Sequence, residues 1–147
     1  MAEYDALLEP FKLKHLTIRN RIMSTAHATG YPADGMPAER YQAYQEAKAE
    51  GGIGLTMFGG SSAVSPDCRA AFGQINAATD AVVPHFERLS ERVHRHGAAI
   101  MCQISHMGRR SRWDAANWLP PVAPSALREP EHRSFPKEME PWDFARI

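Results

Sequence analysis

The sequence has few cysteines, no excess of either charge and no long apolar run. Its two cysteines, Cys68 and Cys102, form no CxxC pair, which excludes a disulfide framework and a cysteine-rich metal site. Seventeen basic side chains balance seventeen acidic ones, so the basic excess typical of nucleic-acid-binding proteins is missing. The apolar runs fall far short of the roughly 20 residues that cross a bilayer, and residues 1–5 begin no hydrophobic signal. These absences predict a cytoplasmic protein that binds neither nucleic acid nor membrane.

Common motifs for nucleotide binding and catalysis are missing as well. No GxGxxG, Walker, HExxH or GxSxG pattern occurs. The histidines His85, His94 and His96 fall in or at the end of one helical pattern, where solvated side chains are the simpler interpretation. Cys102 lies in an apolar run, as a buried and inert thiol does. The sequence therefore predicts no metal site.

What is present is an alternation of strand and helix patterns. Residues 11–18 (FKLKHLTI) alternate around Lys14-His15 and predict a hairpin, and residues 21–26 (RIMSTA) predict a first core strand. Residues 37–50 predict a helix with Tyr41, Tyr44 and Ala47 on one face, stopped by two glycines. A buried strand over residues 53–58 and a loop over residues 59–62 follow.

The second half continues the alternation. Asp80 is the predicted cap of a second helix that His96 and Gly97 end, with an inward stripe beginning at Val83. Residues 98–104 predict a third strand, residues 113–141 an irregular surface excursion, and residues 138–147 the opening of a third helix. Strands that alternate with helices through short connections pair in parallel. The predicted fold is α/β, and three strands with exposed edges suggest an incomplete domain.

Polar and small residues gather where the predicted strands end. In parallel α/β sheets chemistry collects at the carboxyl ends of the strands. Small residues there let a flat ligand approach the backbone, and an amide such as Gln103, expected to be buried, needs hydrogen-bond partners. A structural histidine, simple turn glycines and a loop-capping glutamine remain the alternatives. The candidate positions are Thr25, Ala26, His27, Gly59, Gly60 and Gln103.

In chain order, five segments resemble the old yellow enzyme family of NADH:flavin oxidoreductases. The similarity is greatest to the branch with 2,4-dienoyl-CoA reductases and trimethylamine dehydrogenase. It covers nearly the whole chain, and the order and spacing make it specific although each segment alone is weak. The segments are LLEPFKLKHLTIRNRIM (7–23), KAEGGIGL (48–55), GAAIMCQISHMGRRS (97–111), APSAL (123–127) and PKEME (136–140).

The resemblance implies the N-terminal part of a (β/α)8 TIM barrel that binds FMN non-covalently across its strand ends. By resemblance, Thr25, Ala26 and His27 contact the isoalloxazine ring, Gly59 or Gly60 lies near it, and Gln103 hydrogen-bonds its pyrimidine side. The implied reaction is hydride transfer through FMN, either from reduced nicotinamide to an activated alkene or from an N-methyl amine. His106 and Arg109 carry a family motif but receive no catalytic role.

Two departures from the family limit what the resemblance implies. Ala28 stands where trimethylamine dehydrogenase attaches its flavin through a cysteine, so covalent linkage there is excluded. Gly60 or Ser61 stands where that enzyme has a tyrosine of its substrate cage, and cation–π binding needs the ring.

The anion-binding pair, the proton donor and the phosphate loops of the family come from later strands. In the reductase branch a 4Fe-4S cluster and an FAD- or NAD(P)H-binding region also follow the barrel. We therefore expect residues 1–147 alone to be inactive.

The sequence leaves two functional hypotheses. In the first, the complete protein is a flavin-dependent oxidoreductase acting on a small molecule. In the second, a non-catalytic half-barrel acts as a binding or self-association module, forming a homo-oligomer through its exposed strand edges. A reading frame several hundred residues longer favours the enzyme, and a stable folded product of 147 residues favours the module.

Overall fold

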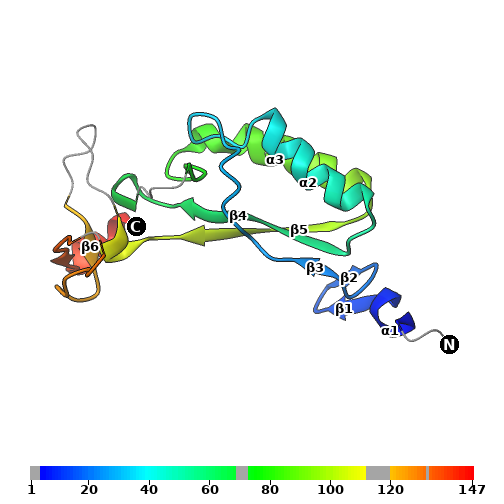
Figure 1. Ribbon diagram of the computed structural model, residues 1–147, viewed down its shortest axis with the longest axis horizontal. Helices are drawn as coiled ribbons and strands as arrows, with labels where there is room; N and C mark the ends of the chain where they lie inside the picture. The colour runs from blue at the N-terminus through cyan, green and yellow to red at the C-terminus, as the bar shows by residue number, and fades with distance from the viewer. Residues whose placement is uncertain (1–3, 69–72, 112–119, 132) are drawn as a thin grey trace.

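Three parallel strands and two helices on one face of them form the centre of the molecule (Figure 1). The computed structural model describes residues 4–68, 73–111, 120–131 and 133–147. The strands lie in the order β3 (Met23–Ser24), β4 (Leu55–Ala63) and β5 (Ala99–Ser105). Helices α2 (Glu39–Glu50) and α3 (Val83–Arg95) connect them. The parallel α/β architecture expected from the sequence is confirmed, although β3 is shorter than the predicted strand.

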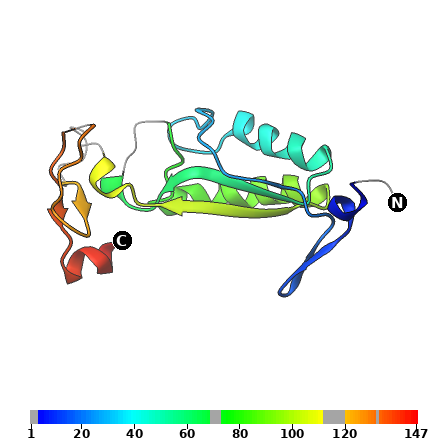
Figure 2. The same ribbon diagram turned by 60° about the horizontal axis from the view of Figure 1, so that its bottom comes forward.

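The predicted hairpin is also confirmed. Strands β1 (Phe11–Leu13) and β2 (Leu16–Ile18) pair antiparallel, and Lys14 at the turn adopts a φ of 53°. Figures 1 and 2 place the hairpin and the short helix α1 (Asp5–Leu8) near the beginning of β3, at the far end of the sheet from the strand ends. The hairpin therefore takes no part in the candidate site.

Helix α2 is rich in alanine, glutamate, glutamine and lysine, all of which favour helix. Its buried residues are Tyr41, Gln42, Gln45 and Ala49. The buried face differs from the face predicted to carry Tyr41, Tyr44 and Ala47, because Ala47 is exposed and Tyr44 only half-buried. Glutamines can be buried here because each has a hydrogen-bond partner. The Gln42 amide donates to the Pro37 carbonyl at 2.8 Å, and the Gln45 side-chain oxygen accepts from the Thr56 hydroxyl at 2.7 Å.

Helix α3 buries Leu89 and Val93 completely, while Val83 is 45% exposed and does not belong to its inward stripe. Asp80 does not cap the helix as predicted. It begins a short 3-10 turn, η2 (Asp80–Val82), with no side-chain capping bond, and α3 follows that turn. The expected end is confirmed, since His96 is the C-cap and Gly97 has a φ of 72°.

Strand β4 continues through the segment that the sequence assigned to a loop. Residues 59–62 lie inside β4, and the pairing with β5 shifts register between Phe58 and Ser62. Gly59 and Gly60 have positive φ values of 106° and 54°. This irregularity is a β-bulge in which glycines supply a conformation that other residues rarely adopt, so the chain keeps pairing where a turn was expected.

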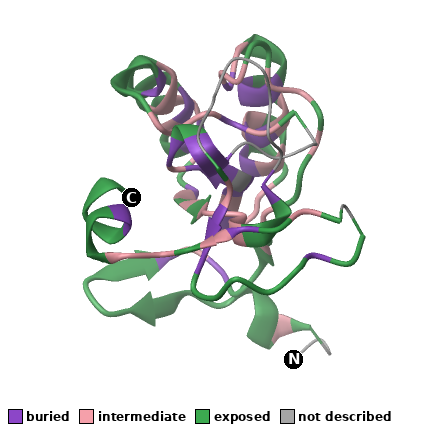
Figure 3. Cartoon of the chain, turned by 90° about the vertical axis from the view of Figure 1, so that its left-hand side faces the viewer, coloured by how far each residue is buried: buried purple, intermediate pink, exposed green. Residues whose placement is uncertain are grey.

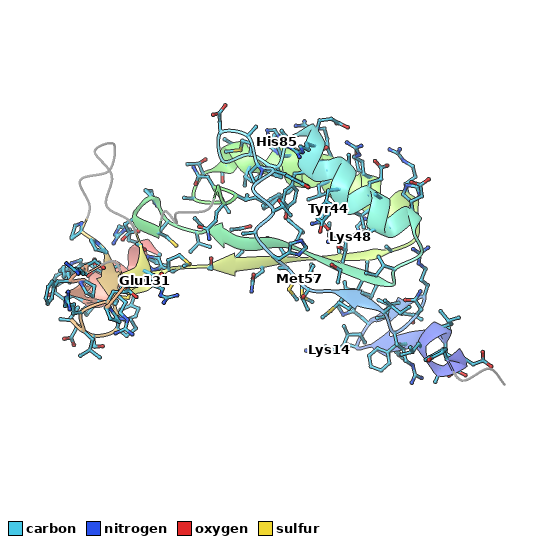
Figure 4. The ribbon with its side chains drawn as sticks, viewed as in Figure 1. Lys14, Tyr44, Lys48, Met57, His85 and Glu131 are labelled. Atoms are coloured by element: carbon cyan, nitrogen blue, oxygen red, sulfur yellow. The ribbon has the colours of Figure 1, made fainter. Side chains whose placement is uncertain are left out.

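The buried apolar residues gather where the two helices face the sheet (Figure 3). The opposite face has no such cover among the residues described. There Met57 pairs in register with Met101, which is 42% exposed, and Met23 is 46% exposed. In Figure 4, Met57 projects on the side of the sheet away from the helices. The core cluster consists of Tyr41, Ala49, Phe58, Ile75, Val82, Leu89, Val93 and Ala98.

The buried side chain of Cys68, rather than Cys102, fits the description of an inert thiol best. Cys68 is fully buried after β4 in the turn η1 (Pro66–Cys68), whereas Cys102 is only partly buried. Burial raises the pKa of both thiols. The Cys68 sulfur lies 3.1 Å from the Ser105 carbonyl oxygen and accepts a hydrogen bond from the Met107 amide at 3.0 Å.

The C-terminal segment is less irregular than expected. Strands β6 (Val122–Ala123) and β7 (Lys137–Glu138) pair in parallel beside the turn η3 (Gly108–Arg110), and α4 (Pro141–Arg146) follows. Reciprocal capping bonds between Glu140 and Asp143 begin α4, which confirms the predicted third helix. The rest of the predicted excursion includes residues 112–119 and 132, which lie outside the described residues. No described helix is long and apolar enough to cross a membrane.

Arg19 joins the C-terminal ends of both long helices. Its guanidinium donates to the carbonyl oxygens of Ala49 at 2.6 Å, Ile53 at 2.8 and 3.0 Å, and His96 at 2.6 Å. Carbonyl groups at a helix C-terminus lack intrahelical donors and carry partial negative charge, so a cation is favoured there. Arg19 thus holds α2, α3 and the start of β4 in one arrangement.

Candidate functional site

The sheet brings the three predicted ligand-binding segments to one edge. Ser24 of β3 pairs with Thr56 of β4, and Phe58 pairs with Cys102 of β5, so the strands run in step toward the same end. Residues 25–27 follow β3, the two glycines continue β4, and Gln103 comes next in β5. The strand register therefore brings the three segments together, as expected.

The two glycines lie directly against the neighbouring backbones. A Cβ atom on Gly60 would overlap the carbonyl group of His27 and the amide nitrogen of Ala28. A Cβ atom on Gly59 would lie 2.5 Å from the carbonyl oxygen of Gln103 and 2.8 Å from the Ser62 hydroxyl. Glycine is therefore required at both positions by the approach of the strands to one another, whether or not a ligand is bound.

A buried polar network behind the sheet holds the bulge in place. The Gly59 amide donates to the Tyr41 hydroxyl at 2.8 Å, and Gln45 links Tyr41 to Thr56, which donates to the Gln45 side-chain oxygen at 2.7 Å. Burial raises the pKa of Tyr41, so its phenol stays protonated. Sequence reasoning placed Tyr41 on one face of the predicted helix but missed its hydroxyl contact. The spacing of Tyr41 and Gln45, four residues apart on one helix, was the available signal.

The candidate residues present polar groups at the open side of this edge. Thr25, His27 and Gln103 are exposed, and Ala26 is partly exposed. The expectation of a buried Gln103 amide was wrong for this chain, and among the residues described the amide has no hydrogen-bond partner. Small residues and an amide that both donates and accepts suit a flat ring with donors and acceptors along its rim. The described residues contain no group of three or more metal-ligating side chains.

His27 lies in a small cluster formed with helix α2. Its Nε2 atom lies 2.6 Å from the Tyr44 hydroxyl, and its Nδ1 atom lies 3.4 Å from the carbonyl oxygen of Thr25. The Lys48 ammonium sits 4.2 Å from the centre of the Tyr44 ring and donates to the Ser24 hydroxyl at 3.0 Å. Tyr44 and Lys48 lie side by side on α2 in Figure 4. The sequence suggested His27 but neither α2 residue.

A second polar cluster ties α4 to the loop after β4. The buried Asp67 carboxylate accepts from Arg146 at 2.8 Å and from the Ser65 hydroxyl, and it lies 3.6 Å from Nε2 of His106. Arg109 donates to the carbonyl oxygen of Arg128 at 3.4 Å, and its own carbonyl oxygen accepts from the Ser134 hydroxyl at 2.7 Å. These contacts support a structural role for the motif histidine and arginine.

The second cluster makes the docking of α4 sensitive to acid. Burial acts to raise the pKa of Asp67, but the bonds from Arg146 and Ser65 outweigh it and hold the pKa below its ordinary value. Asp143 accepts hydrogen bonds from the Lys137 ammonium and from the Glu140 amide, and together they lower the pKa of Asp143 to about 2. Carboxylates with depressed folded-state pKa values stabilise the fold above their unfolded value, about 3.9, and this stabilisation is lost as the pH falls through the folded value.

We therefore expect hydrogen-exchange protection of residues 141–147 to fall between about pH 4 and pH 2, before the core strand β5 loses its own. In the Asp67→Asn variant part of this loss is already present at pH 6. Equal protection of α4 in both proteins at pH 6 would show that the Asp67–Arg146 pair does not hold the helix.

Comparison with known families and proteins shows what the chain is similar to. The profile of the NADH:flavin oxidoreductase / NADH oxidase family matches residues 6–146. The chain is 53% identical over 97% of its length to the probable N-methylproline demethylase of Rhizobium meliloti (strain 1021). It is 53% identical over 99% of its length to the multifunctional alkene reductase/demethylase OYE of Caballeronia cordobensis.

A third relative is the N,N-dimethylglycine/sarcosine dehydrogenase of Chromohalobacter salexigens, 50% identical over 98% of the chain. The chain covers 21%, 22% and 21% of these three proteins, about a fifth of their length. Among solved structures, the chain is similar to morphinone reductase in complex with tetrahydroNAD, with a TM-score of 0.81 and 25% identity. The match covers 95% of this chain and 42% of the morphinone reductase chain. The arrangement of strands and helices is thus that of the old yellow enzyme TIM barrel.

Proposed function

We propose, since this chain belongs to the NADH:flavin oxidoreductase / NADH oxidase family, that the complete protein is an FMN-dependent oxidoreductase and that residues 1–147 form the first part of its catalytic barrel. The observation that carries the proposal is the meeting of the three strand-end segments at one edge of a parallel sheet. The uncovered methionine-bearing face of that sheet is consistent with further barrel strands packing on it.

The residues at this edge fit a flavin. Thr25, Ala26 and His27 would lie along the isoalloxazine ring, with Gln103 directing its amide to the pyrimidine side, where it can both donate and accept. Gly59 and Gly60 would contribute backbone only, because the directions of their missing side chains are filled by protein. When bound, FMN supplies the hydride acceptor and donor for the reaction.

Loss of the Gln103 amide tests this assignment. In the complete protein, Gln103→Ala is expected to weaken FMN binding roughly tenfold and to shift the flavin potential, because one or two hydrogen bonds to the ring are lost. Met101→Leu, a change of similar volume on the same strand but two residues before the edge, is the matched control and should leave both quantities unchanged. An unaltered dissociation constant and potential in Gln103→Ala would contradict the assigned role.

For the substrate we propose an N-methylated amino acid that is demethylated by oxidation. The names of two relatives, an N-methylproline demethylase and an N,N-dimethylglycine/sarcosine dehydrogenase, support this class. Reduction of an activated alkene by reduced nicotinamide is the second candidate, supported by the relative named as both alkene reductase and demethylase.

Mixing the oxidised complete protein with each substrate under anaerobic conditions separates these reactions. Bleaching of the flavin by N-methylproline or dimethylglycine, with formaldehyde released, supports demethylation. Bleaching only by NADH or NADPH, followed by recovery with an enone, supports alkene reduction. A native mass spectrum of the natural protein should show one FMN per subunit, whereas a bare 16.4 kDa chain would favour the alternative of a non-catalytic binding module.

Four further features belong to the same proposal. The protein would act in the cytoplasm, which the two free cysteines support, and would form a homo-oligomer. A 4Fe-4S cluster and an FAD- or NAD(P)H-binding region would lie in the remainder of the complete protein. Iron analysis and the nucleotide content of the purified protein test these last two.

A further inference from the structure

We infer that Tyr44 is a positioning residue that, together with the carbonyl group of Thr25, holds the His27 ring with Nδ1 facing the carbonyl oxygen and Nε2 facing the Tyr44 hydroxyl, so that the ring meets the flavin in a single orientation. The inference rests on the proposed function for its flavin half only. Its geometric half rests on the cluster of His27, Tyr44 and Lys48 at the end of β3.

The oxygen atoms around His27 select the tautomer. The carbonyl oxygen of Thr25 can only accept, and it lies 3.4 Å from Nδ1, so the proton belongs on Nδ1. Nε2 then carries a lone pair and accepts from the Tyr44 hydroxyl at 2.6 Å. The opposite tautomer would place the Nδ1 lone pair against the carbonyl lone pairs. Since burial raises the pKa of Tyr44, its phenol keeps the proton that this arrangement requires.

The Tyr44 ring is itself held on several sides. The Lys48 ammonium lies 4.2 Å from its centre, and Lys48 is anchored by the Ser24 hydroxyl. The rings of Tyr31 and His27 meet it edge-on at centroid distances of 5.6 and 5.7 Å. A hydroxyl on a ring fixed in this way points in one direction, which is what a positioning group requires.

The test uses the complete protein labelled with ¹⁵N-histidine and measured at pH 8 before and after removal of its flavin. His27 is assigned by the loss of its signals in His27→Gln. In the wild type, Nδ1 should show the shift of a protonated nitrogen and Nε2 that of an unprotonated one. Tyr44→Phe keeps the ring but removes the hydroxyl that donates to Nε2, which leaves the 3.4 Å contact with the Thr25 carbonyl to select the tautomer, so the proton should move at least partly to Nε2. Tyr31→Phe, the matched control in the same ring cluster, should not move it.

The flavin readout is the midpoint potential and the dissociation constant of FMN. Tyr44→Phe is expected to weaken FMN binding roughly two- to tenfold, the effect of one hydrogen bond, while Tyr31→Phe leaves it unchanged. A wild-type His27 protonated at Nε2 or at both nitrogens would overturn the inference. So would a tautomer change in Tyr44→Phe with no change in either flavin quantity.

Failure of the proposed function looks different. A complete protein that neither carries nor takes up flavin would refute the proposed function, and the histidine signals of the flavin-free protein would still report whether Tyr44 sets the tautomer.

Discussion

Replacement of Gly60 by alanine is expected to abolish FMN binding by the complete protein and to lower its free energy of unfolding by about 3 kcal/mol or more. Two costs combine. A residue with a side chain is strained at a φ of 54°, and the added Cβ would overlap the backbone of His27 and Ala28. The overlapping atoms are main chain and cannot rotate away, so β3 and β4 must separate where the flavin would bind.

Gly30→Ala is the matched control for this variant. Gly30 has a similar φ of 68°, but nothing lies within 4 Å of its added Cβ. It should therefore show only the conformational cost, about 1 kcal/mol. Urea unfolding and flavin content would be measured for both variants. Equal destabilisation by the two substitutions would show that the strands do not approach one another at Gly60 as described.

The second large effect is expected at Arg19. Arg19→Met should lower the free energy of unfolding by about 3 kcal/mol, because carbonyl oxygens of Ala49, Ile53 and His96 lose a charged donor in a partly buried place. Arg19→Lys should recover less than half of the loss. A single ammonium cannot reproduce the planar fork that reaches groups in three segments of the chain.

Arg21→Met provides the comparison at the neighbouring arginine. The Arg21 side chain is 46% exposed, lies 3.6 Å from an exposed Glu9 and contacts the Phe11 ring, so its loss should change the unfolding free energy by no more than about 0.5 kcal/mol. Urea unfolding followed by circular dichroism gives both values. Similar midpoints for Arg19→Met and Arg21→Met would refute a special role for Arg19.

Features with a local cause were predictable from the sequence. The hairpin follows from alternation around Lys14-His15, the end of α3 from His96-Gly97, and β5 from the apolar run over residues 98–102. The meeting of the three candidate segments was also predictable, because parallel strands place their carboxyl ends at one edge. Each of these depends on neighbouring residues or on a general rule of chain topology.

Features that depend on contacts between distant segments were not predictable. In the sequence the pair of glycines resembles a turn. β4 nevertheless continues through them, because its residues after the bulge still pair with β5. The Tyr44–His27 contact joins residues 17 apart, and the Asp67–Arg146 pair joins residues 79 apart. No periodicity along the chain reports which side chains the folded backbone brings within hydrogen-bond distance.

The sequence by itself determined the order of strands and helices, the family and the edge of the sheet at which the candidate residues collect. The tertiary structure alone decided that Gly60 is required by the His27–Ala28 backbone, that Gln103 is exposed in this chain, and that the Tyr44 hydroxyl lies against His27. The physical reason is that secondary structure follows from local propensity and apolar patterning, whereas these three features depend on strand register and on the approach of one backbone to another.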